Sequence, residues 1–192
     1  MIQRDPTKWF PHDYVMKYTF VPLVPRFVTP NMITFFRMAF TPIMLWFLYS
    51  EQYGIGVPLF LFLALTDAID GSVARIRKQI TDWGTFYDPV ADKVLIGSVV
   101  LVVVAQHVNL LFALIILFVE ATLVFGGYLR RFKGHVTSAN VFGKTKMFLQ
   151  VVGVMFLLVA VWAGVDIFIP VSIGTFSLAI VFAVISLFTY GL

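Results

Sequence analysis

Four aspartates lie close together in the sequence, inside stretches that are otherwise apolar. A carboxylate at the centre of a membrane-spanning helix costs about 2.5 to 3.5 kcal/mol, so such residues are candidates for function. Several carboxylates in a site of low dielectric constant cannot all stay ionised alone, and either protons or cations must neutralise them. Divalent cations would balance the charge, and oxygen ligands favour Mg²⁺, Mn²⁺ or Ca²⁺ over Zn²⁺. The residues are Asp67, Asp70, Asp88 and Asp92.

The spacing of these aspartates places them on one side of each of two predicted helices. An antiparallel hairpin of the two helices would bring the two acidic faces together. Small residues beside the acids leave room for a phosphate or another ligand. At about 100° per residue, the first face holds Asp67, Asp70, Gly71 and Ala74, and the second holds Gly84, Asp88 and Asp92.

The composition indicates what kind of fold must position these acids. The chain has 192 residues, of which 60% are hydrophobic and 12% are charged. A soluble domain has about 25% charged residues, so an ordinary soluble enzyme is excluded, and the abundance of apolar residues excludes disorder. The absence of cysteine excludes disulfides, thiolate metal sites and thiol catalysis. These features predict an integral membrane protein.

Six apolar stretches predict an all-α fold with six transmembrane helices, at about 20 residues for each span. Residues 1–30 contain five prolines and no continuous apolar run, so they are not a secretory signal. We interpret them as a juxtamembrane arm with an amphipathic helix, followed by one transmembrane catalytic domain over residues 31–192. The predicted spans are residues 32–49, 55–74, 85–105, 110–129, 147–163 and 167–190.

The cations predict the orientation of these spans, because Lys and Arg are retained in cytoplasmic loops. They gather in the arm and the start of the first helix, in the second loop and in the fourth loop, whereas the opposite loops have none. The amino terminus, both cation-rich loops and the carboxyl terminus are therefore expected on the cytoplasmic side, as are the acidic ends of the second and third helices. Arg37, Arg75, Arg77, Arg131 and Lys144 are among these cations.

The acidic segment resembles the signature of the CDP-alcohol phosphatidyltransferase family. It is Asp67-x-x-Asp70-Gly71-x-x-Ala74-Arg75, then eight residues, then Gly84-x-x-x-Asp88-x-x-x-Asp92, and all eight fixed positions match. The segment from Thr29 to Arg37 is similar to the start of the family's first helix. Six helices preceded by a surface helix also fit, so the resemblance covers most of the chain.

The resemblance implies transfer of a phosphatidyl group from CDP-diacylglycerol to an alcohol, with release of CMP. It implies that the four aspartates bind two divalent cations, Mg²⁺ or Mn²⁺, and that Asp92 is also the base that deprotonates the acceptor. It further implies a homodimer in the cell (inner) membrane. The residues implied for the CDP-lipid site are Asn31, Thr34, Gly71, Ala74, Arg75, Thr81 and Gly84.

The fourth loop and the start of the fifth helix carry more cations than topology requires, and they predict a phosphorylated acceptor. The pattern Gly143-Lys144-x-Lys146 followed by Gln150 resembles the phosphatidylglycerophosphate synthase branch, whose acceptor is glycerol 3-phosphate. That branch commonly has Arg-Glu where this chain has Val119-Glu120, so phosphatidylglycerol and inositol phosphate stay open as acceptors. The candidate acceptor-binding residues are Arg130, Arg131, Lys144 and Lys146.

A hypothesis from another class is a small divalent-cation transporter, whose cation path the intramembrane acids would form. The clustering of all four aspartates at one end of their helices argues against it. Glu120 is the only other candidate for an acidic station along such a path, and for it we favour a position facing a cavity over a pairing with a neighbouring helix. An intramembrane prenyl transferase is a further alternative, but its acids are spaced differently.

Overall fold

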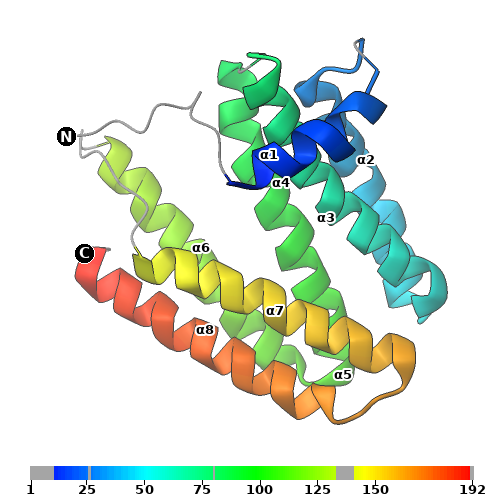
Figure 1. Ribbon diagram of the computed structural model, residues 1–192. Coiled ribbons are helices and arrows are strands. Elements are labelled where there is room, and N and C mark those ends of the chain that lie inside the picture. The colour runs from blue at the N-terminus through cyan, green and yellow to red at the C-terminus, as the bar shows by residue number, and fades with distance from the viewer. Residues whose placement is uncertain (1–10, 26, 80, 133–140, 191–192) are drawn as a thin grey trace. The chain divides into compact units, whose positions relative to one another are not determined.

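The computed structural model describes residues 11–25, 27–79, 81–132 and 141–190, and within these ranges it contains helices and no strand (Figure 1). A short helix and a 3₁₀ turn precede a series of long helices. In chain order the elements are α1 (Pro11–Thr19), η1 (Val21–Leu23), α2 (Pro30–Tyr49), α3 (Tyr53–Ile76), α4 (Asp82–Val99), η2 (Val100–Val104), α5 (Ala105–His107), α6 (Leu110–Phe132), α7 (Val141–Ala163) and α8 (Phe168–Tyr190).

Each predicted apolar stretch is helical, which confirms the all-α prediction. The stretch over residues 85–105 differs in one respect, because it contains a π-helical turn at Val100–Val104 between α4 and α5. Such turns insert one extra residue into a helix and shift the faces on either side of it. By length and hydropathy, five segments of the described chain are able to cross a membrane: Pro30–Tyr49, Tyr53–Ile76, Val90–His107, Val141–Ala163 and Phe168–Thr189. The apolar segment Leu110–Gly126 of α6 is shorter.

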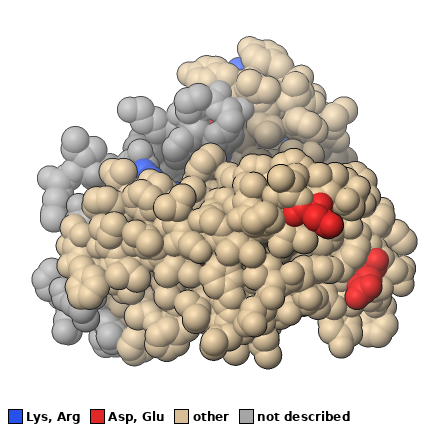
Figure 2. Space-filling view, turned by 90° about the horizontal axis from the view of Figure 1, so that it is seen from below, with Lys and Arg blue, Asp and Glu red and all other residues tan. Residues whose placement is uncertain are grey.

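Large apolar side chains cover much of the surface. Phe35, Phe118 and Phe188 are 68%, 73% and 77% exposed. In the face drawn in Figure 2, charged side chains are few among the residues that are described. Soluble proteins rarely expose apolar patches of this extent, whereas lipid tails solvate them. The protein is therefore a membrane protein.

The chain forms two compact units, Met1–Leu95 and Ile96–Leu192. The predicted arm, residues 1–30, falls within the first unit. There α2 and α3 pack as a hairpin around Met44, Leu48 and Phe60, all of which are buried. Gly56 allows a close approach of the two helices, because a Cβ there would lie 2.7 Å from Leu48 Cδ2 and 3.1 Å from Leu48 N.

The segment between α1 and α2 is fastened to the end of α3 by Arg77. The guanidinium of Arg77 donates hydrogen bonds to the backbone carbonyls of Val21, Val24, Pro25 and Val28. The carbonyls of Val21 and Pro25 also accept from the backbone N–H groups of Val24 and Val28, so at these two positions Arg77 adds a second donor to a short connection.

In the second unit, α7 and α8 form the most extensive helix pair, and Phe176 of α8 is fully buried. The aromatic ring of Phe176 also meets Phe112 of α6 edge to face, with 6.4 Å between the ring centroids. An ion pair between Glu120 of α6 and Lys146 of α7 joins a second pair of helices. In the described part of this unit, apolar packing and an ion pair between α6 and α7 thus hold the helices together.

Candidate active site

Two side chains of helix α2, one with a hydroxyl and one with a guanidinium, contact the predicted aspartates. The helix begins at Pro30, and the Thr29 side chain accepts a hydrogen bond from Met32 N at 3.3 Å. A threonine cap followed by proline is a strong start signal for a helix. Thr34 and Arg37 follow three residues apart, so they share a face of α2, and both side chains are fully buried. That face meets α3.

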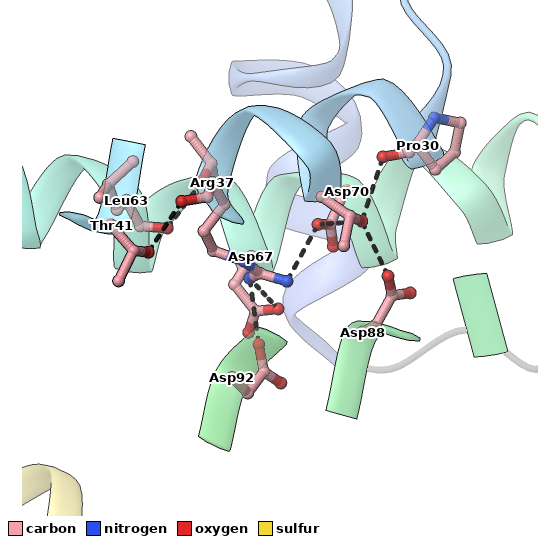
Figure 3. Close-up of polar contacts among 10 residues, drawn as sticks. Pro30, Arg37, Thr41, Leu63, Asp67, Asp70, Asp88 and Asp92 are labelled. Carbon is pink, nitrogen blue, oxygen red and sulfur yellow. Dashed lines mark hydrogen bonds and ion pairs between the residues drawn. The ribbon is translucent and has the colours of Figure 1, made fainter. Parts of the chain in front are cut away.

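Arg37 lies among three of the four predicted aspartates (Figure 3). Its guanidinium forms an ion pair with Asp67, and it lies 3.5 Å from Asp70 Oδ2 and 3.1 Å from Asp92 Oδ1. Its nitrogens make no hydrogen bond of regular geometry within the described residues. Arg37 therefore neutralises part of the acidic charge without fixing the direction of each carboxylate.

The fourth aspartate is joined to the cluster through Thr34. The Thr34 hydroxyl donates to Asp88 Oδ1 at 2.7 Å, and the same oxygen lies 3.2 Å from Asp70 Oδ2. Asp70 thus touches both residues of α2, and the face of α2 links α3 to α4. The structure brings together all four aspartates that the sequence predicted, and they all belong to the first unit.

The aspartate side chains differ in how much of their surface is exposed to solvent. The side chain of Asp70 is 3% exposed, that of Asp92 is 22% exposed and that of Asp67 is 41% exposed, while Arg37 is 0% exposed. One guanidinium cannot balance four ionised carboxylates, so protons or further cations must neutralise the remaining charge in these partly buried surroundings. Asp67 and Asp92 form its accessible side, where a ligand from the solvent would enter.

The aspartates suit a divalent cation by donor type and by charge, because carboxylate oxygens are hard ligands. Over the described part of the chain, no group of three or more His, Asp or Glu side chains stands close enough together to hold a metal ion. The carboxylates are spread around Arg37 and Thr34 instead. The chemistry of the residues fits such a cation, and the positive charge that the structure itself places there is Arg37.

All the residues predicted for the CDP-lipid site belong to the first unit, and Thr34 contacts the aspartates directly. Thr81 Oγ1 donates to Asn31 Oδ1 at 2.9 Å, which joins the start of α4 to the start of α2. Gly71 and Ala74 lie on α3 and are half-buried, and Gly84 lies in α4. Arg75 forms a salt bridge with Asp13 of α1.

The residues predicted for the acceptor belong to the second unit. Lys144 is exposed on α7, whereas Lys146 is buried and forms an ion pair with Glu120. Arg130 and Arg131 lie in α6, and their side chains are outside the described part. Glu120 was expected to face a cavity, but the structure gives it a partner on the neighbouring helix. An acid that is expensive in the membrane is thereby neutralised by a buried lysine.

Two residues of the site were not identified from the sequence. Arg37 was counted among the topological cations and named in the segment similar to the family's first helix, but it was given no role in the site, although an ionisable residue inside a predicted span signals an internal partner. Nothing in the sequence pointed to Asp13, since it is one acidic residue in a basic arm, and the arm has no regular spacing of apolar and polar residues. Its role depends on Ser72 and Arg75, which lie about sixty positions away in the chain.

Comparison with known proteins agrees with the signature. The family model for CDP-alcohol phosphatidyltransferase matches residues 27–189. A relative from Aquifex aeolicus, named CDP-diacylglycerol--glycerol-3-phosphate 3-phosphatidyltransferase, is 32% identical over 125 residues, which are 63% of this chain and 70% of the relative. A relative of the same name from Pseudomonas fluorescens is 40% identical over 84 residues. These residues are 42% of this chain and 43% of that relative. A probable cardiolipin synthase (CMP-forming) from Drosophila melanogaster is 37% identical over 38% of this chain and 23% of its own.

Proposed function

The chain belongs to the CDP-alcohol phosphatidyltransferase family, and we propose that it transfers a phosphatidyl group from CDP-diacylglycerol to glycerol 3-phosphate. CMP is the other product, and the reaction belongs to phospholipid biosynthesis. The observation that carries this proposal is the convergence of all four signature aspartates on one cluster in the first unit. The names of the Aquifex and Pseudomonas relatives support glycerol 3-phosphate as the acceptor.

In this proposal Asp67, Asp70, Asp88 and Asp92 are the ligands of two divalent cations, Mg²⁺ or Mn²⁺. When bound, such cations offset the charge of the diphosphate and that of the transition state. The side chains of Asp67 and Asp92 are 41% and 22% exposed, which suits them to receive a ligand from the solvent. Asp70 is almost fully buried, which suits it to anchor the site.

Asp92 also serves as the base. One of its carboxylate oxygens accepts the proton of the acceptor hydroxyl, and the hydroxyl oxygen forms a bond to the phosphorus that bears the diacylglycerol. The bond from that phosphorus to the CMP oxygen breaks, and CMP leaves with the electron pair. This role suits Asp92 because its side chain is 22% exposed and therefore reachable, and the guanidinium of Arg37 lies 3.1 Å away.

The CDP-lipid is proposed to bind along Asn31, Thr34, Gly71, Ala74, Arg75, Thr81 and Gly84. The hydrogen bond between Thr81 and Asn31 supports this proposal, since it gathers polar groups at the ends of α2 and α4. Small residues on α3 leave space beside the acids. Arg75 would supply a planar, charged donor to a phosphate oxygen.

The proposed arrangement in the membrane has six spans, with the apolar part of α6 completing the set. Both termini and the active site face the cytoplasm, residues 1–30 form the juxtamembrane arm, and the membrane is the inner membrane of a bacterium. Tyr14, Tyr18 and Phe27 of the arm are 59%, 76% and 77% exposed, as aromatic residues at a membrane surface are. A homodimer is proposed on the family resemblance.

A panel of acceptors tests the function. Purified protein in detergent, with CDP-diacylglycerol and Mg²⁺ or Mn²⁺, is expected to release CMP when glycerol 3-phosphate is added and not without an acceptor. Release only with phosphatidylglycerol would favour cardiolipin synthesis, for which the Drosophila relative is the supporting observation. Release only with inositol phosphate would identify the third acceptor. No release with any acceptor, together with metal uptake into vesicles that lack the lipid substrate, would favour the transporter.

Removing the charge of Lys144 is expected to weaken binding of the acceptor. Arg130, Arg131, Lys144 and Lys146 are proposed to bind the acceptor phosphate, but Lys146 already pairs with Glu120, whereas Lys144 is exposed. The variant Lys144→Gln should raise the KM for glycerol 3-phosphate about tenfold, as expected for one lost charge-assisted hydrogen bond. The KM for CDP-diacylglycerol should stay the same.

The matched control for this experiment is Lys17→Gln, which removes a cation of the arm. If Lys17→Gln and Lys144→Gln raise the KM for glycerol 3-phosphate equally, general attraction by positive charge explains the effect, and the site on α7 is wrong. If only the KM for CDP-diacylglycerol changes in Lys144→Gln, this lysine belongs to the lipid site instead.

A further inference from the structure

Asp13 is a fully buried acid on a helix of the surface arm. Its carboxylate accepts a hydrogen bond from Ser72 Oγ at 2.6 Å through Oδ1. It also accepts from Arg75 Nε at 2.7 Å through Oδ2, and from Arg75 Nη2 at 2.8 Å through Oδ1. The side chain of Asp13 is 0% exposed and that of Arg75 is 17% exposed. A bidentate pair of this kind fixes the plane of the guanidinium as well as its position.

The guanidinium of Arg75 is confined from a second side by Gly71. A Cβ at position 71 would lie 3.2 Å from Arg75 Nη1 and 3.4 Å from Nη2, so the side chain folds back over the glycine. Residues 71 and 75 are four apart and share a face of α3, and Asp67 lies four residues earlier on that face. The guanidinium of Arg75 is therefore held against α3, and the side chain is only 17% exposed.

Fastening the arm does not by itself require Arg75. The connection between α1 and α2 is already tied to the end of α3 by the hydrogen bonds of Arg77 to four carbonyls. Ser72 would also satisfy one oxygen of Asp13. The specific consequence of the bidentate contact is the orientation of the guanidinium. Long cationic side chains otherwise sample many rotamers.

We propose that Asp13 is a positioning residue for the CDP-lipid site. It holds the guanidinium of Arg75 above Gly71, in one orientation, before the diphosphate of the lipid arrives. Binding then avoids the entropy cost of ordering this side chain, because the fold has already ordered it. This inference rests on the proposed function, in which Arg75 binds the diphosphate.

The variant Asp13→Asn tests the proposal through the separate kinetic constants. It keeps the size of the side chain but loses the charge and the bidentate acceptor. The KM for CDP-diacylglycerol is expected to rise about tenfold, whereas kcat and the KM for the acceptor change less than about threefold. In the Arg75→Met background, Asp13→Asn should add no further rise, because Asp13 acts through Arg75. An equal rise in both backgrounds would overturn the proposal.

Arg77→Met is the matched control, because it loosens the same arm without touching the contact between Asp13 and Arg75. It should leave the KM for CDP-diacylglycerol within about twofold of the wild type, since its hydrogen bonds go to backbone carbonyls only. If Arg77→Met raises this KM as much as Asp13→Asn does, docking of the arm is responsible, and the positioning role is overturned.

If Asp13→Asn fails to fold, the variant Gly71→Ala tests the same proposal. The added methyl group would press on the guanidinium of Arg75 and leave Asp13 intact. Because Gly71 itself belongs to the proposed lipid site, the selective rise in the KM for CDP-diacylglycerol is expected when Arg75 is present and not in the Arg75→Met background. An unchanged KM in the folded Gly71→Ala protein would overturn the proposal. If the wild type releases no CMP with any acceptor, the proposed function fails. If the wild type is active but neither Asp13→Asn nor Gly71→Ala changes the KM for CDP-diacylglycerol, only the positioning role is overturned.

Discussion

Asp92→Asn is expected to lower kcat for CMP release by about 10²- to 10⁴-fold, the range that general-base catalysis contributes. Asparagine keeps the size of the side chain, but its amide cannot accept the proton of the acceptor hydroxyl. The other signature aspartates, Asp67, Asp70 and Asp88, stay in place around Arg37 and Thr34. Metal-dependent binding of CDP-diacylglycerol should therefore survive in part. The measurements are the kcat from initial rates and the binding of CDP-diacylglycerol with and without Mg²⁺.

The control for this substitution is Asp166→Asn, since Asp166 is exposed and far from the signature in the chain. Its kcat should equal that of the wild type. An Asp92→Asn enzyme with unchanged kcat would remove Asp92 from the role of base. An Asp92→Asn enzyme that has lost all metal-dependent lipid binding would show that the main contribution of Asp92 is to the metals.

Arg37→Met is expected to destabilise the protein when no divalent cation is present. Arg37 is 0% exposed and pairs with Asp67, Asp70 and Asp92, so its removal leaves three carboxylates without their cation. Breaking a buried ion pair costs about 3 to 5 kcal/mol. We expect the lower end, about 3 kcal/mol, because Asp67 is 41% exposed and Asp92 is 22% exposed. For a chain of this size the apparent Tm in EDTA should fall by about 10 °C.

Divalent cations should reverse much of this loss, which separates an electrostatic effect from a packing effect. The cluster is more negative in Arg37→Met than in the wild type, so Mg²⁺ should raise the Tm of the variant by more than that of the wild type. Arg37→Lys keeps the positive charge but loses the planar guanidinium. Its Tm in EDTA should lie between those of the wild type and Arg37→Met. If Mg²⁺ shifts the Tm of all three proteins equally, Arg37 does not balance the charge of the aspartates.

These two experiments report different properties of the same cluster. Asp92→Asn tests what the cluster does to a substrate, and its readout is a rate. Arg37→Met tests what holds the cluster together, and its readout is a melting temperature that needs no substrate. A chain that is not a transferase would fail the first test and could still pass the second. The stability of the site is thus separable from its chemistry.

Local patterns in the sequence determined the helices and the acidic faces. Runs of apolar residues predicted helices at α2, α3, α6, α7 and α8, because each run is long enough to form a helix and its ends carry polar or glycine residues. The spacing of the aspartates predicted their shared face, because that spacing is a property of the helix alone. The π-helical turn at Val100–Val104 was not predicted, since the valines there suit an uninterrupted helix as well.

The tertiary structure decided which groups neutralise which charges. Arg37 meets Asp67 and Asp92, Asp13 meets Arg75, and Glu120 meets Lys146, and in every case the partners lie on different helices. No local pattern specifies such pairs, because they depend on how helices distant in the chain pack together. In an apolar medium a buried charge must find a partner, so the sequence could show that partners were needed, but only the packing of the helices could select them.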